Sequence, residues 1–186
     1  MRELKQLGCQ VYCLESHGAA DWILHNQEVH VVSLETAEQA WPFEPESFQL
    51  VVFWHVFEHL PNPVKALQQA TQVLEPDKVL CISVPNIASL QARLGRATWF
   101  HLDVPRHLFH FSKHGLVELL ERHNYEIIKV TSGDAIQNLY GWCQSLANLF
   151  TPGDTNALYR FLQGGVPRRS VAKISLSIQL VTVVIW

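Results

Sequence analysis

Apolar and polar positions fall into blocks that predict strands and helices in turn. Short apolar runs rich in β-branched residues predict strands at residues 11–14, 29–34, 48–53, 79–84 and 125–130. The segments between them predict helices at residues 19–26, 63 to about 74, 87–94 and 113–122. Pro63 suits the first turn of its helix and Ser112 can cap the last one. This alternation predicts an α/β fold, a Rossmann-like mostly parallel sheet with helices on both faces.

The end of the chain is unusually apolar. Residues 170–186 carry a single charged side chain, Lys173, and follow Arg168 and Arg169. A helix needs about 20 apolar residues to cross a bilayer, and the β-branched residues of 178–185 suit a strand. We therefore expect a final sheet strand, with peripheral membrane contact through the C-terminus as the alternative.

Composition places the chain among ordinary globular proteins. The 186 residues are 48% hydrophobic and 17% charged, with a formal net charge of −3, which fits one domain, residues 1–186, with a sizeable core. We expect the core at residues 7–130 and a C-terminal helical extension at 131–186. No stripe of Lys and Arg occurs, so nucleic acid is not an expected partner.

The four cysteines suggest a reducing compartment. Cys9, Cys13, Cys81 and Cys143 are scattered, and no later Cys/His pair completes a zinc-finger spacing. The first residues are charged and lack the apolar stretch of a signal peptide. Free thiols in the cytoplasm are the expected reading.

Polar residues follow several predicted strands where each strand ends. Glu15 follows the first, His55 and Glu58 follow the third, and Pro85-Asn86 follows the fourth. Carboxyl ends of parallel strands form one edge, where open α/β sheets bind ligands. An acidic residue at the position of Glu15 accepts hydrogen bonds from ribose hydroxyls in nucleotide-binding folds; a solvated surface glutamate is the alternative.

Three interpretations compete for His55, Glu58 and His59. The pattern H-x-x-E-H is a zinc-protease signature, but it needs one continuous helix, and Pro61 follows closely. The second interpretation is a ligand edge in which His55 acts as a general base, while Glu58 and His59 orient the following loop or hold a divalent metal. The third is structural, with Glu58 near the start of the next helix and His59 bonded to a backbone carbonyl.

Four segments follow one another in the order of a known family pattern: residues 47–63, 74–76, 82–86 and 103–112. Together they resemble class I S-adenosylmethionine-dependent methyltransferases, specifically the bacterial branch grouped as methyltransferase type 23. The resemblance covers residues 7 to 130. It implies that the chain uses S-adenosylmethionine as cofactor.

The resemblance also implies roles for individual residues. Glu15 would hold the ribose, Leu34 and Glu35 would lie near the adenine, and Trp54 and His55 would lie beside the methionine part. The loop at residues 99–111 would close over the methyl acceptor, with substrate contacts from Arg106, His107 and His110; a structural salt bridge is the alternative for Arg106. His55 and His107 are the candidate catalytic bases. Related O-methyltransferases bind metal through E-x-x-E-H; here His55 replaces the first acidic residue, so no metal is expected.

The chain departs from the family pattern at its start. Members begin with a strand and a glycine-rich cofactor loop, whereas Gly8 is the early glycine here. Gln49, Cys13 and Asp77-Lys78 stand where the family has Asp, Gly and a Gly-Gly turn. We therefore expect an N-terminally incomplete class I methyltransferase fold, whose second and fourth family strands have unpaired edges in the interior. Two origins fit this expectation: a truncated part of a longer enzyme, or a paralogue that is losing the family's motifs.

The predicted function is S-adenosylmethionine-dependent methylation of a small molecule or of a glycan or lipid precursor. The alternative is a non-catalytic methyltransferase-like remnant that acts as a binding or structural protein.

Overall fold

The computed structural model describes residues 6–15, 29–33, 39–131, 135–151, 156, 159 and 181–184. Contacts within the chain define two compact units, residues 1–84 with 175–186 and residues 85–174. We describe each unit by itself. The predicted helix at 19–26, the positions of Leu34 and Glu35, and residues 170–180 and 185–186 of the apolar end lie outside the described residues.

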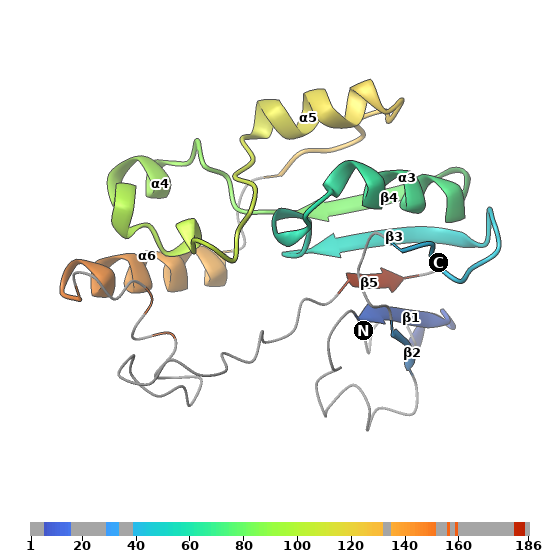
Figure 1. Cartoon of the computed structure of the whole chain (residues 1–186), viewed down its shortest axis with the longest axis horizontal. Coiled ribbons are helices and arrows are strands. Elements are labelled where there is room, and N and C mark those ends of the chain that lie inside the picture. The colour runs from blue at the N-terminus through green and yellow to red at the C-terminus, as the bar shows by residue number, and fades with distance from the viewer. Residues whose placement is uncertain are drawn as a thin grey trace. The chain divides into compact units, whose positions relative to one another are not determined.

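The first unit is built on a five-stranded sheet in the order β2-β1-β5-β3-β4 (Figure 1). Its strands are β1 (Val11–Glu15), β2 (Val29–Ser33), β3 (Phe48–Trp54), β4 (Leu74–Ser83) and β5 (Val181–Val184). The pairs β1–β2 and β3–β4 are parallel, and β5 is antiparallel to both β1 and β3. A mostly parallel α/β sheet was predicted, and the structure confirms it.

The final strand, β5, lies between β1 and β3. Val181 pairs with Leu14 on one side and Phe53 on the other, and Thr182 pairs with Cys13 and Val52. The interior edges of β1 and β3 were expected to be unpaired, and this expectation was wrong. The β-branched C-terminal end supplies the missing backbone partners, at the cost of reversing the strand direction in the middle of the sheet.

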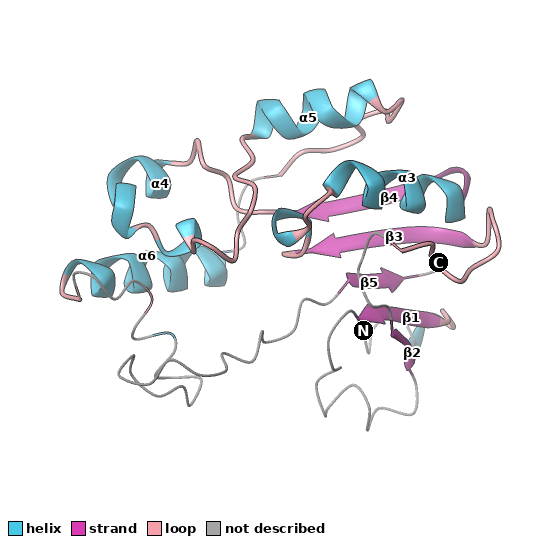
Figure 2. Cartoon of the chain, viewed as in Figure 1, coloured by secondary structure: helices cyan, strands magenta, loops and turns pink. Residues whose placement is uncertain are grey.

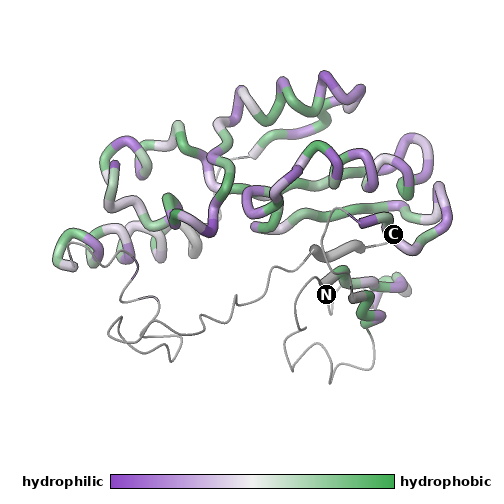
Figure 3. The backbone as a smooth tube through the Cα atoms, in the orientation of Figure 1, coloured by the Kyte–Doolittle hydropathy of each residue, from purple (hydrophilic) through white to green (hydrophobic). Residues whose placement is uncertain are grey.

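The core of the first unit lies between the sheet and α3 (Pro63–Val73). Asn62 caps this helix by accepting a hydrogen bond from the Lys65 N–H, and the buried side chains of Ala66, Leu67 and Ala70 recur at helical spacing. Figure 3 shows the matching apolar character of β3, where Val51 and Phe53 are fully buried. This packing fixes where the end of β3 lies.

Strand β4 begins five residues earlier than its predicted start at residue 79. Leu74 pairs with Phe48, but the next pair is Leu50 with Val79, so residues 75–78 form an irregular insert in the strand. Asp77 in this insert has a φ of 62°, in the left-handed region that favours glycine. The left-handed backbone explains why a Gly-Gly turn was the expected sequence here.

The second unit consists of short helices and loops (Figure 2). Its elements are α4 (Leu90–Gly95), the 3-10 turns η2 (Arg96–Thr98) and η3 (Phe100–Leu102), α5 (Lys113–Arg122) and α6 (Ala135–Leu149). Helix α4 begins later than predicted because Ser89 accepts a hydrogen bond from the Ala92 N–H and so caps it. Ser112 caps α5 in the same way, through the Gly115 N–H, as predicted.

The predicted strand at residues 125–130 is wrong. These residues have no regular secondary structure, and Ile128 is 79% exposed. An apolar alternation alone cannot make a strand, because its backbone groups need a neighbouring ladder. In the described part of the chain the sheet ends at β4, and residues 125–130 add no sixth strand to it.

The interior of the second unit is largely polar. Its buried apolar side chains, within the described residues, are Ala92 and Trp99, whereas Gln91, His107, Gln144, Ser145, Asn148 and Asn156 are all buried. None of the helices in the described ranges combines the length and apolar character needed to cross a bilayer.

A pair of asparagines holds this polar interior together. The Asn148 amide donates to the Thr98 carbonyl and to the Asn156 side-chain oxygen, at 3.0 and 2.9 Å. In return, the Asn156 backbone N–H donates to Asn148 Oδ1 at 2.7 Å. The Asn156 amide reaches the Phe100 carbonyl and Asp103 Oδ1. Both side chains thus use all their amide protons to fix residues 98–103 against α6.

We expect Thr182→Pro to lower the free energy of unfolding by about 1–3 kcal/mol, because proline removes an N–H from the middle of the sheet. Urea unfolding followed by circular dichroism measures the change. Lys129→Pro is the control, since Lys129 is exposed and lies outside helices and strands; its effect should stay within about 0.5 kcal/mol. Equal effects for the two prolines would contradict the central position of β5.

Asn148→Ala should destabilise the protein by about 2–4 kcal/mol, because it leaves buried groups of Thr98 and Asn156 unsatisfied. Hydrogen exchange at the amides of residues 98–103 should rise in the same variant. Gln72→Ala on the exposed side of α3 is the matched amide deletion, and it should change stability by less than about 0.5 kcal/mol. Unchanged protection of residues 98–103 in the Asn148 variant would argue against the asparagine pair as their anchor.

Candidate active site

Four parallel strands of the first unit end at one edge of the sheet. The terminal residues pair in register, Glu15 with Ser33 and Trp54 with Ser83. Because β5 is antiparallel to both β1 and β3, those two strands run in the same direction. The predicted alignment of Glu15 with the end of β3 is therefore confirmed.

The register across β5 sets the spacing between the two halves of this edge. Leu14, Val181 and Phe53 lie in one row across β1, β5 and β3. Glu15 and Trp54 each follow that row by one residue, so the backbone ends of β1 and β3 lie two strand spacings apart, about 10 Å. The amino end of β5 lies between them at this edge.

His55 leaves β3 with an unusual backbone. Its φ is 51°, in the left-handed region that non-glycine residues seldom occupy. A hydrogen bond of 2.9 Å from the His55 N–H to the Ser83 carbonyl secures this turn to the end of β4. Bulky residues held in such conformations cluster at functional sites. The turn directs the chain from β3 into the 3-10 turn η1 (Phe57–His59).

Glu58 places a buried carboxyl group beside His55. The distance from His55 Nδ1 to Glu58 Oε1 is 3.5 Å; the Glu58 side chain is 1% exposed and that of His55 is 27% exposed. With Nδ1 facing a carboxylate, a neutral imidazole keeps its lone pair on Nε2. Glu58 therefore orients a partly exposed ring whose other nitrogen can accept a proton.

The helix required by a zinc-protease site is not formed. Strand β3 continues to Trp54, His55 has a left-handed backbone, and η1 spans just three residues. His55 and His59 are therefore not on one helical face. The H-x-x-E-H pattern arises here from a strand end followed by a turn.

Trp54 offers an exposed aromatic surface at the same edge. It is 49% exposed, and its ring lies 5.9 Å from that of His55, nearly perpendicular to it. Phe53 and Phe57, before and after it in sequence, are fully buried, with ring centroids 5.3 Å apart. The backbone on either side of Trp54 is therefore anchored in the core, while the Trp54 side chain is exposed.

The predicted substrate residues lie in the second unit. Arg106 contacts Asp103, with 3.2 Å between Nε and Oδ2, and the N–H groups of Arg106 and His107 both donate to the Asp103 carbonyl. Arg106 thus makes the structural salt bridge that was the alternative to a substrate contact. Substrate binding by Arg106 stays a prediction.

His107 and His110 are each held by a backbone carbonyl. His107 Nδ1 lies 2.7 Å from the His101 carbonyl, and His110 Nε2 lies 2.9 Å from the Leu102 carbonyl. A carbonyl can only accept, so both of these nitrogens carry the proton. In neutral His107 the lone pair is consequently on Nε2, as a general base requires, whereas in neutral His110 it is on Nδ1.

Sequence reasoning missed the residues that support this loop. Ser145 on α6 accepts a hydrogen bond of 2.9 Å from the Phe100 N–H, and Asn156 donates to the same Asp103 that contacts Arg106. Residues 131–186 were predicted as a helical extension with a final strand, and no residue of the extension was assigned to the site. The available signal was the sequence of α6, which has Ser145 and Asn148 on the face where a packed helix normally has apolar side chains.

Comparisons with known proteins agree with this geometry. A family model described as a methyltransferase domain matches residues 1–130. An S-adenosylmethionine-dependent methyltransferase of Thermotoga maritima, described as a possible histamine N-methyltransferase, has a similar structure. Its TM-score is 0.51 at 21% identity, over 61% of this chain and 54% of that one.

A proposed methyltransferase from Bacillus halodurans C-125 also matches, with a TM-score of 0.44 and 24% identity over 57% of this chain and 46% of that one. This chain therefore spans about half the length of the solved structures it resembles. The curated proteins contain no match.

The family model covers well over half of the chain, and the strands end at one edge as a methyltransferase sheet requires. The chain therefore belongs to the methyltransferase-domain family, the class I S-adenosylmethionine-dependent methyltransferases.

Proposed function

We propose that the chain binds S-adenosylmethionine at the carboxyl edge of β1–β4 and methylates a small molecule or a glycan or lipid precursor. The observation that carries the proposal is the register of this edge, which sets Glu15 opposite Trp54 across β5. The positions of the C-terminal ends of β1 and β3 fit a ribose-binding carboxylate and an aromatic platform. A cytoplasmic location is part of the proposal and agrees with four cysteines that form no disulfide.

Each residue at the edge has a proposed role. The carboxylate of Glu15 accepts hydrogen bonds from the two ribose hydroxyls, and the Trp54 ring excludes water beside the methionine part. His55, oriented by Glu58, adds a polar contact there. S-adenosylmethionine supplies a methyl group on a positively charged sulfur, so alignment and desolvation of the acceptor provide most of the rate enhancement.

An acceptor hydroxyl would need a base, and we assign this role to His107, with His55 as the alternative. The His101 carbonyl holds the Nδ1 proton of His107 and leaves Nε2 to take the proton. His110 and Arg106 are the proposed acceptor contacts. Arg106 is oriented by Asp103, which limits the directions in which its guanidinium can donate.

A non-catalytic role is the second candidate, and one observation favours it. The middle of the edge contains the amino end of the antiparallel strand β5. The residues that precede it, 175–180, contain no glycine, so that segment cannot supply a glycine-rich cofactor loop. A chain that folds this way without binding the cofactor would serve as a binding or structural protein. The C-terminal end then acts as part of the sheet, and peripheral membrane contact through it remains a proposal.

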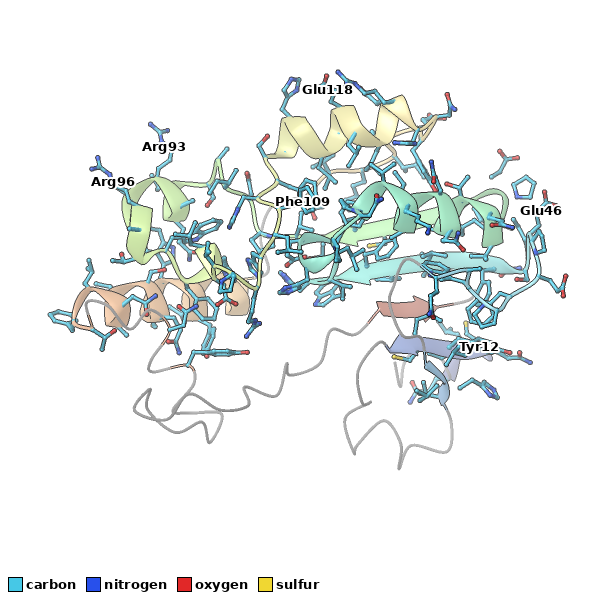
Figure 4. The ribbon with its side chains drawn as sticks, viewed as in Figure 1. Tyr12, Glu46, Arg93, Arg96, Phe109 and Glu118 are labelled. Atoms are coloured by element: carbon cyan, nitrogen blue, oxygen red, sulfur yellow. The ribbon has the colours of Figure 1, made fainter. Side chains whose placement is uncertain are left out.

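Glu15→Gln should weaken S-adenosylmethionine binding about 10- to 100-fold, because hydrogen bonds to a charged acceptor become bonds to a neutral one. Isothermal titration calorimetry measures the dissociation constant. The control is Glu46→Gln, since Glu46 lies beyond the amino end of β3, at the opposite edge (Figure 4). It should bind like the wild type.

Two results would contradict the enzyme proposal. Absence of any binding heat with the wild-type chain would favour the non-catalytic role. Binding that is equally strong in the Glu15 and Glu46 variants would show that the cofactor does not use the end of β1.

A further inference from the structure

Helix α6 has its polar side chains inside and its apolar side chains outside. Gly141, Gln144, Ser145 and Asn148 are buried. The large apolar residues are exposed: Leu139 by 68%, Leu146 by 53%, Leu149 by 58% and Phe150, directly after the helix, by 82%. Water-soluble helices have the opposite distribution.

The two kinds of residue occupy opposite faces of the helix. At 100° per residue, the buried positions 141, 144, 145 and 148 fall on one face. The other face, which we call the outer face of α6, consists of Leu139, Trp142, Cys143, Leu146, Leu149 and Phe150. The pattern is therefore a continuous apolar stripe and not a set of scattered exposed residues.

Hydrogen bonds prevent the helix from turning its apolar side inward. Ser145 accepts from the Phe100 N–H and donates to the Gly141 carbonyl, and Asn148 bonds the Thr98 carbonyl and Asn156. Space is also limited, since a Cβ at Gly141 would meet the Gln91 amide at 2.9 Å. Rotating α6 would leave these buried polar groups without partners, so within the described part of the second unit the outer face stays exposed.

The outer face is free of charge. Residues 135–151 contain no Asp, Glu, Lys, Arg or His, whereas roughly a quarter or more of an ordinary soluble surface is charged. Within the second unit, Arg93 and Arg96 point away from α6 (Figure 4). Moving this face out of water therefore requires no charged side chain to lose its hydration.

The size of the outer face argues against a second copy as its occupant. A helix of 15 residues is about 22 Å long and about 10 Å wide, so one face projects about 220 Å². A stable protein interface needs about 800 Å² from each partner. A lipid surface has no such minimum, because a helix can lie in the interface with a few apolar side chains inserted.

We propose that the outer face of α6 docks onto the surface of a lipid bilayer. Leu139, Leu146, Leu149 and Phe150 enter the acyl boundary, and the ring of Trp142 lies at headgroup level, where tryptophan is enriched. Docking by α6 is separate from contact through the apolar C-terminal end, whose strand β5 is part of the sheet. The binding is hydrophobic and not electrostatic.

Flotation of the full chain with phosphatidylcholine vesicles tests the proposal. The wild type should float with the vesicles, and high salt should change the bound fraction less than about twofold, since α6 has no charge for salt to screen. Leu146→Glu should lower the partition coefficient about tenfold or more, because it removes one leucine that enters the bilayer and adds a charge. Leu139→Glu, about two helical turns away, should act in the same way.

Ile128→Glu is the matched control, because Ile128 is exposed in the second unit but lies outside α6. It should float like the wild type. Both leucines are exposed, so the variants should keep the far-ultraviolet circular dichroism of the wild type. The proposal is wrong if the wild type does not float, if the α6 variants float as well as Ile128→Glu, or if binding requires anionic lipid and is lost in salt. It is also wrong if the wild type is a dimer that Leu146→Glu converts to monomers.

Discussion

The backbone pairing of β5 with both β1 and β3 is the interaction on which the sheet depends. Strands β1 and β3 belong to two separate parallel pairs, β1–β2 and β3–β4, and β5 lies between them. Without it, two rows of backbone N–H and C=O groups would lie unpaired in the middle of an apolar sheet, each costing the free energy of a lost hydrogen bond. Four β-branched residues thus join two halves that otherwise share no backbone ladder.

The same strand also determines what the candidate active site can be. It keeps Glu15 and Trp54 in register and separates them by two strand spacings. Because it runs in the opposite direction, it presents its amino end where the neighbouring strands present their carboxyl ends. The candidate site therefore combines the aligned carboxyl ends of four parallel strands with a central strand of reversed direction. This combination makes both cofactor binding and a non-catalytic role testable proposals.

The sequence predicts the parts of this structure that depend on local patterns. Apolar runs located β1, β2 and β3, and Pro63 and Ser112 correctly marked the starts of their helices, which depend on interactions within one turn. The chemistry at the strand ends followed from this, since parallel strands must end together. His55 and Glu58 were singled out because an apolar strand gave way abruptly to ionisable side chains.

Features that depend on distant pairing could not be predicted in the same way. Residues 125–130 have the composition of a strand but pair with no neighbouring strand in the described part of the chain, whereas residues 181–184 pair with both β1 and β3. The composition of a strand does not identify its neighbours, so the place of β5 between β1 and β3 was missed. The inward polar face of α6 was missed for a related reason. Asn148 is buried because it bonds to Thr98 and Asn156, which are distant in sequence from its neighbours on the helix or lie outside it.

The most direct test of this account is a disulfide between β5 and β1. Native Cys13 lies directly opposite Thr182 in the antiparallel pair, a separation of about 4.5–5.5 Å between Cβ atoms, which is close to what a disulfide needs. Under mild oxidation, Thr182→Cys should form a bond to Cys13 that mass spectrometry detects in the monomer, whereas Val184→Cys, opposite Val11, should not. Failure of the Thr182 variant to link, or linkage of both variants to Cys13 in equal amounts, would contradict the placement of β5 at the centre of the sheet.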